Sequence, residues 1–124
     1  MKCLRLHRLV AFASVLPAVA TLHGCTDPNP VETVNVSLKN TETYSFPTVG
    51  GDEEGARISV QAKHYSTSEI RRNAETNWIA VYVYRPTAGF VGSDHAEVQL
   101  LTGSDGASPP TSIKTVSFRF VIHD

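Results

Sequence analysis

Hydrophobic and polar residues alternate with a period of two along most of this chain, which is the pattern of β-strands with one buried face. The alternation is longest near the C-terminus, where Val116, Phe118, Phe120 and Ile122 share one face. The strands predicted in this way cover 34–38, 58–62, 96–100 and 116–122, with a shorter one over 43–46.

Residues 78–84 are apolar on both faces and rich in β-branched and aromatic side chains, which predicts a central strand. We expect Ile79, Val81 and Val83 to face the core. Aromatic side chains on the other face either pack against neighbouring strands or form an exposed platform for a carbohydrate or a partner's side chain, and the pattern favours packing. These aromatic residues are Trp78, Tyr82 and Tyr84.

Segments rich in turn-forming residues separate the predicted strands, at 50–55, 86–89 and 102–110. Residues 66–75 are polar, with Ile70 as the one large apolar residue, and predict a loop or a single helical turn. Six or seven short strands with no helix to form crossovers predict an all-β fold: an antiparallel β-sandwich, with one domain over 33–124.

The N-terminus has a different character. Lys2, Arg5 and Arg8 precede an apolar run over 9–22, as in the charged and hydrophobic regions of a signal peptide. The run is shorter than the ~20 residues that span a bilayer, and Pro17 would kink it. The sequence therefore predicts a targeting segment rather than a permanent membrane span.

Two cleavage sites compete at the end of this run. One is Ala18-Val19-Ala20, a small-x-small site whose cleavage after Ala20 would give a soluble secreted protein. The other is Leu22-His23-Gly24-Cys25, which resembles the lipobox of bacterial lipoprotein precursors, although His23 departs from the small or hydroxyl-bearing residue usual there. In that family the cysteine is lipidated and becomes the first residue of the mature chain.

The cysteine count favours the lipobox. The chain has two cysteines, and either cleavage removes Cys3, so the mature chain cannot form an internal disulfide. A lone cysteine in an oxidising compartment needs a use, and lipidation of Cys25 supplies one.

The lipoprotein resemblance implies a signal peptide over 1–24 and a membrane anchor of several acyl chains on Cys25. Residues 25–32 include Pro28 and Pro30 and predict a short extended tether. Thr26, rather than an aspartate, follows the cysteine, which in this family implies the outer membrane, with the domain facing the periplasm or the cell surface.

Residues 84–94 form a compact turn whose parts have separate roles. Pro86 ends a strand, Gly89 permits a positive φ, Phe90 folds back over the end of the sandwich, Gly92 lets the chain turn again, and Asp94 caps that turn through its own backbone.

This turn resembles the Y-x-P-x-x-G-F-x-G-x-D motif of bacterial immunoglobulin-like and cadherin-like repeats. The resemblance implies an immunoglobulin-like sandwich with a structural corner and no catalytic residues. Ala96 and Val98 stand where those repeats usually have Phe and Tyr, which keeps the inward alternation and shrinks the core. The matching residues are Tyr84, Pro86, Gly89, Phe90, Gly92 and Asp94.

Charge and motifs narrow the function. Acidic residues outnumber basic ones once the basic leader is removed, which argues against nucleic acid as a partner. Motifs such as GxSxG and HExxH are missing from the sequence, so we expect no enzyme activity, no cofactor and no metal site. The acids at 52–54 are adjacent rather than spaced like calcium ligands, and predict a solvated hairpin tip.

Three histidines remain after cleavage, His64, His95 and His123, at spacings that set no metal site. We expect them to face solvent at strand edges. A nucleophile and base pair would need a Ser or Thr beside one of them.

The sequence thus predicts a membrane-anchored, non-enzymatic envelope lipoprotein whose domain binds or supports an envelope protein or glycan. The alternatives are a periplasmic inhibitor that presents a loop such as Gly103 to Pro110 to a hydrolase, and a soluble secreted sandwich.

Overall fold

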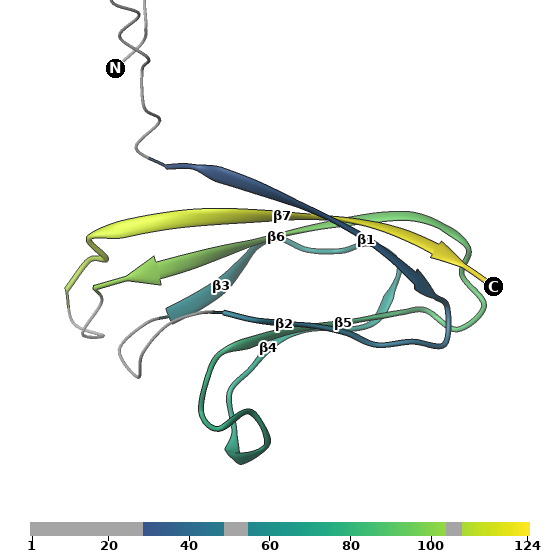
Figure 1. Ribbon diagram of the computed structural model, residues 1–124, viewed down its shortest axis with the longest axis horizontal. Coiled ribbons are helices and arrows are strands. Elements are labelled where there is room, and N and C mark those ends of the chain that lie inside the picture. The colour runs from purple at the N-terminus through teal and green to yellow at the C-terminus, as the bar shows by residue number, and fades with distance from the viewer. Residues whose placement is uncertain (1–28, 49–54, 104–107) are drawn as a thin grey trace, which may run out of the picture.

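The computed structural model describes residues 29–48, 55–103 and 108–124, which form an all-β sandwich, as predicted (Figure 1). A short 3-10 helix, η1 (Ala74–Thr76), interrupts the strands of this part of the chain. Those strands are β1 (Val31–Lys39), β2 (Tyr44–Pro47), β3 (Gly55–Val60), β4 (Tyr65–Arg71), β5 (Val81–Pro86), β6 (Gly92–Thr102) and β7 (Ser112–His123).

The strands form two sheets, in the orders β1-β7-β6-β3 and β2-β5-β4. The runs β2-β5-β4 and β3-β6-β7 correspond to the B-E-D and C-F-G strands of an immunoglobulin sandwich. The first strand differs, because β1 lies beside β7 and runs parallel to it, from Val31 opposite Thr115 to Lys39 opposite His123. The predicted antiparallel sandwich is confirmed for the other strand pairs, and this pair is the exception. No helical crossover is needed there, because the rest of the domain connects the two strands.

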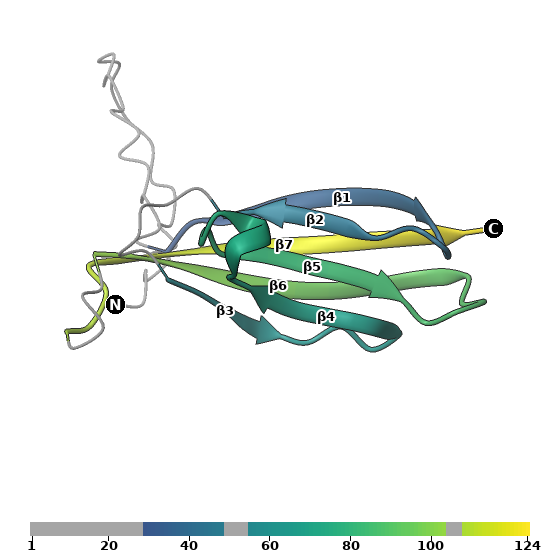
Figure 2. The same ribbon diagram turned by 90° about the horizontal axis from the view of Figure 1, so that it is seen from below.

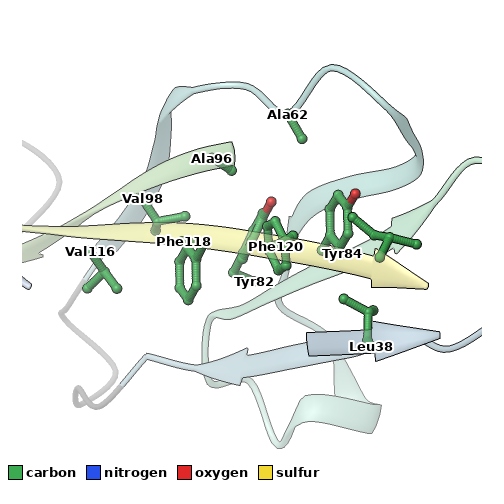
Figure 3. Packing of buried hydrophobic residues seen from close by; sticks show 10 residues of the cluster. Leu38, Ala62, Tyr82, Tyr84, Ala96, Val98, Val116, Phe118 and Phe120 are labelled. Atoms are coloured by element: carbon green, nitrogen blue, oxygen red, sulfur yellow. The ribbon is translucent and has the colours of Figure 1, made fainter. Parts of the chain in front are cut away.

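Aromatic rings from both sheets form the core around β7 (Figure 3). The predicted inward face of β7 is confirmed, since Val116, Phe118, Phe120 and Ile122 are all fully buried. The Phe46 and Tyr82 rings lie 5.0 and 5.1 Å from that of Phe118. The core is therefore organised by ring contacts between the sheets, which add to the area that burial removes from water.

The predicted inward face of β5 is wrong. Tyr82 and Tyr84 are fully buried in the core, with Tyr84 stacked on Phe120 at 3.9 Å. Val83 is also buried but does not belong to that core cluster, Val81 is half-buried, and Ile79 lies outside the strand and is 41% exposed. The tyrosines can point inward because their hydroxyls find partners at the edge of the core: Tyr82 with Ser68 at 3.0 Å and Tyr84 with Asp94. Figure 3 shows both hydroxyls on the side where Ala62 lies.

Strand β4 was not predicted, because its buried positions carry little apolar signal. Ser68 faces inward and Ile70 is half-buried, so a polar serine occupies a position where alternation of apolar and polar residues would require an apolar one. The Ser68 hydroxyl forms hydrogen bonds with the side chains of Gln61 and Tyr82, so its burial leaves no polar group without a partner. The prediction of a loop or a single helical turn over 66–75 is therefore wrong for 66–71, which belong to β4, and the one turn of helix, η1, begins only at Ala74. At the N-terminus, β1 begins at Val31, so the last two residues of the expected tether belong to the strand.

The strand directions give the sandwich two distinct ends (Figures 1 and 2). One end, called the tether end here, holds the start of β1 and the connections β2–β3, β4–β5 and β6–β7. The opposite end, called the far end, holds the connections β1–β2, β3–β4 and β5–β6 and the C-terminus. Any chain segment before β1 therefore joins the domain at the tether end.

Replacing Phe118 with Ala should destabilise the domain by about 3–5 kcal/mol, because it removes a ring that contacts both sheets and leaves a cavity. Urea unfolding followed by circular dichroism measures the change. Val121→Ala on the exposed face of the same strand is the matched control and should cost under about 1 kcal/mol. Equal losses for the two variants would contradict this description of the core.

Candidate functional site

The corner at the far end is built on the buried carboxylate of Asp94. Its oxygens accept hydrogen bonds from the backbone N–H groups of Lys63 (2.9 Å), His64 (2.8 Å) and His95 (2.9 Å). The Tyr84 hydroxyl donates a fourth, at 3.0 Å. Asp94 therefore caps the β3–β4 turn, and only the bond from His95 is the local capping that the sequence predicted.

This arrangement lowers the pKa of Asp94. Burial acts to raise the pKa, but the three backbone donors and the Tyr84 hydroxyl outweigh it and hold the pKa below its usual value. Burial, together with the hydrogen bond to Asp94, raises the pKa of Tyr84 well above its usual value. The pair is thus an ionised carboxylate and a neutral phenol, and it joins β5 of one sheet to β6 of the other.

The remaining corner residues complete the turn between β5 and β6. Gly89 and Gly92 have φ values of 77° and 145°, which favour glycine, and a Cβ at Gly92 would lie 3.2 Å from the Phe90 ring. Phe90 stacks on the His64 ring at 4.2 Å, so the β5–β6 and β3–β4 turns pack against each other. Pro86 is buried at the end of β5.

Asp94→Asn should destabilise the domain by about 2 kcal/mol at pH 7, since it replaces an acceptor of four hydrogen bonds with an amide. Because the folded-state pKa is lowered, the carboxylate's contribution is complete above its unfolded pKa of about 4 and is lost as the pH falls through the folded value. Urea unfolding at several pH values should show the difference between the parent and Asp94→Asn shrinking below pH 4. A difference that does not depend on pH would contradict the assignment.

A groove of about 830 Å³ lies on the outer face of the four-stranded sheet, beside this corner. Its floor comes from the outward positions of three adjacent strands, and the end of β3 and the β3–β4 turn add further lining. Asp94 holds the backbone of that turn, so the corner positions part of the groove. The groove is lined by Asn35, Val36, Ser37, Val60, Gln61, Lys63, His64, Ser93, Asp94, His95, Arg119, Phe120 and Val121.

Two cations give the groove its charge. Neither Arg119 nor Lys63 forms an ion pair with a side chain among the described residues. Arg119 lies opposite Asn35 on one side and His95 on the other, so a row of three polar side chains crosses the sheet. No local sequence signal marks this row, because its members come from separate strands and only the strand register brings them together.

One histidine does lie beside a serine. His95 Nε2 is 3.0 Å from Ser117 Oγ and 3.5 Å from Glu97 Oε1. The Ser117 hydroxyl and the Glu97 carboxylate both lie beside Nε2 of His95, whereas in a Ser-His-acid triad the serine and the acid contact different ring nitrogens. Ser117 also pairs with Glu97 on one side and Thr33 on the other, so its strand backbone supplies no free pair of N–H groups to stabilise an oxyanion. This contact is therefore a hydrogen bond on the sheet's outer face.

The other predicted candidates lie apart. His123 Nδ1 is 3.1 Å from the Asp124 carbonyl oxygen at the exposed end of β7. Within the described ranges no three His, Cys, Asp or Glu side chains come close enough to hold a metal ion, and no helix is long and apolar enough to cross a membrane. Cys25, the acids at 52–54 and residues 104–107 lie outside the described residues.

Of the two alternatives for these aromatic residues, the favoured one, packing, holds for Tyr82 and Tyr84, which are in the core, and no platform forms, because Trp78 is not on their strand. Trp78 lies in the β4–β5 loop, 62% exposed, with φ 61°, and Asn77 before it has φ 50°. A positive φ is a true outlier for a bulky side chain. These two residues break the alternation that made 78–84 resemble one strand.

Trp78→Gly should raise the free energy of unfolding by about 1 kcal/mol, because glycine removes the penalty of a positive φ at an exposed position. Trp78→Ala keeps a Cβ there and should change stability by less than about 0.5 kcal/mol. Thermal unfolding of the two variants beside the parent makes the comparison. A clear loss of stability in both would mean that the indole packs against the domain.

Comparisons with known proteins give likenesses of shape only. No protein-family model and no curated protein sequence matches the chain. Among solved structures, a cysteine protease inhibitor from Entamoeba histolytica is 13% identical with a TM-score of 0.42, covering 76% of this chain and 94% of its own. Amebosin is 11% identical with a TM-score of 0.46, covering 78% and 100%.

A third structure, an endo-fucoidan hydrolase of glycoside hydrolase family 107, is 12% identical with a TM-score of 0.46. The match covers 77% of this chain and 13% of the hydrolase. Identities and TM-scores this low assign neither a family nor an activity.

Proposed function

We propose that this chain is the precursor of a cell-envelope lipoprotein, anchored through lipid on Cys25, whose mature domain is a non-enzymatic binding module. The observation that supports the proposal is the short distance along the chain between the lipobox-like sequence and the folded domain: β1 begins at Val31, six residues after Cys25. A lipid on Cys25 would hold the tether end close to a membrane, with the outer membrane as the expected one.

The same arrangement turns the groove outward. Its residues from the β3–β4 turn and from the ends of β3 and β7 lie toward the far end, away from the anchor. The unpaired cations Lys63 and Arg119 suit a partner that carries carboxylates, and polar side chains of β1 and β6 offer hydrogen bonds beside them. The module would thus bind an acidic envelope protein or glycan at the end facing away from its membrane.

The anchor is tested in a bacterial host that processes lipoproteins. The full-length chain should enter the membrane fraction, and its mature form should carry the mass of a diacylglyceryl or triacyl modification. Cys25→Ala should remove both the lipid and the membrane partition. A membrane-bound Cys25→Ala variant, or a parent cleaved after Ala20 with no lipid mass, would show that the lipobox prediction is wrong.

The groove is tested by co-sedimentation with purified peptidoglycan sacculi, whose stem peptides carry free carboxylates. Replacing both Lys63 and Arg119 with Ala should weaken binding at least tenfold, since each charge-assisted hydrogen bond is worth about 1.5–3 kcal/mol. The matched control replaces Arg57 and Lys114, which lie on other parts of the sheet and have side-chain partners of their own. An equal loss of binding in the control would mean that the loss reflects net charge alone. Unchanged binding in the groove variant would mean that the groove does not bind the sacculi.

Inhibition of a hydrolase stays the alternative, and the base of the predicted loop favours it in one respect. Gly103, at φ 73°, lies so close to Thr111 that an added Cβ would clash with the threonine hydroxyl, and Thr111 donates to the Thr102 carbonyl from both its N–H and its hydroxyl. The stem of the 103–110 segment is therefore held tightly. An inhibitor would lose its effect on a hydrolase panel when residues 104–107 are replaced by a Gly-Ser linker, whereas sacculus binding would persist.

A further inference from the structure

We propose that the β4–β5 loop inserts Trp78 and Ile79 into the interface of the lipid bilayer beside the anchor, so that the sandwich stands with its tether end on the membrane. This inference rests on the proposed function. It concerns a second, reversible membrane contact, made by protein side chains rather than by the lipid on Cys25.

Exposed apolar side chains lie toward both ends of the sandwich, but only at the tether end do two of them, Trp78 and Ile79, stand next to each other in one loop of the described chain. Trp78 is 62% exposed and Ile79 is 41% exposed in the β4–β5 loop, and Val31 is 62% exposed at the start of β1. The two elements belong to different sheets: both lie toward the tether end along the long axis, and the β4–β5 loop extends from the outer side of the three-stranded sheet (Figures 1 and 2). Single exposed apolar residues are ordinary, but a tryptophan and an isoleucine adjacent in one loop form a ready contact for an apolar phase.

The loop that presents them is firmly built. Asn73 and Thr76 form a reciprocal capping box around η1, with bonds of 3.0 and 3.1 Å. The Trp78 N–H donates to the Asn73 carbonyl at 2.8 Å, and the Ile79 N–H donates to that of Thr76 at 3.0 Å. This network holds Trp78 at a positive φ and projects its side chain into solvent. Backbone strain that is maintained at an exposed residue points to a role outside folding.

The short chain before β1 indicates that the apolar phase contacted by this loop is the lipid bilayer. From Cys25 to Val31 the chain can extend at most ~20 Å, because each residue spans at most ~3.6 Å. An acylated Cys25 therefore holds the tether end within about that distance of the headgroups, so the bilayer is the apolar phase that this end meets most often. Tryptophan is the side chain enriched at membrane interfaces, where its ring is apolar and its N–H remains hydrated.

The chain holds one tryptophan, which makes Trp78 its own probe. The processed, lipidated protein made from the full-length chain is reconstituted into phosphatidylcholine vesicles, which carry no net charge. Relative to a detergent-free Cys25→Ala sample, the emission should shift to the blue and acrylamide quenching should fall at least threefold. Lipids brominated near the headgroup end of the acyl chain should quench Trp78 more than lipids brominated near the chain terminus.

A matched variant moves the probe to the far end. Trp78→Ala combined with Val91→Trp places the tryptophan in the β5–β6 turn, where Val91 is 53% exposed. Its emission should stay open to acrylamide and unaffected by brominated lipid in the same vesicles. Because both proteins carry the same anchor, the difference between them reports on orientation rather than on attachment.

The possible failures are distinguishable. A protein whose mass shows lipid on Cys25, but whose Trp78 is quenched by acrylamide as in water and not by brominated lipid, overturns the insertion and leaves the anchor standing. Shielding of Trp78 that appears only after a soluble envelope extract is added assigns the loop to a protein partner and also overturns it. A chain with no lipid on Cys25 overturns the proposed function itself.

Discussion

The far end of this sandwich depends on one buried negative charge. Asp94 comes from one sheet and Tyr84 from the other, and the turn that the carboxylate caps is itself the passage from β3 to β4, between the sheets. Removing a carboxylate from water is unfavourable unless its oxygens are satisfied, and here four donors satisfy them. That requirement determines where the Tyr84 hydroxyl lies beside the stacked Tyr84 and Phe120 rings. It also determines the placement of the β3–β4 turn and, through it, the shape of the adjoining groove.

The fold could be predicted as far as alternation carried unambiguous information. Over residues 116–122 of β7 every second residue is large and apolar and the others are mostly polar, so one face was the obvious core. In β5 both faces are apolar, and the choice between aliphatic and aromatic faces depends on partners for the tyrosine hydroxyls, which lie on β4 and β6. Strand β4 was missed because the sequence does not distinguish a buried, hydrogen-bonded serine such as Ser68 from a serine in a polar loop.

The site was less accessible to sequence reasoning. The corner motif is local, so its residues could be named together, although the partners of Asp94 lie 30 and 31 positions away in the β3–β4 turn. The groove has no local signature, since strand register brings His95 beside Arg119 and the bond to Asp94 holds the Lys63 backbone near them. Trp78 was placed on the central strand with packing as the favoured outcome, but it lies in the β4–β5 loop with a left-handed backbone and is exposed.

The parallel pairing of β1 with β7 has a mechanical consequence. The chain enters β1 at one end of the sandwich and leaves β7 at the other, and nine residue pairs join the two strands in register. A pull between a membrane-held N-terminus and a load at the far end is directed along both strands, so the whole ladder resists sliding at once rather than opening bond by bond. A domain tethered in this way would carry tension through its first and last strands, while the corner between β5 and β6 lies outside the direct path of the load.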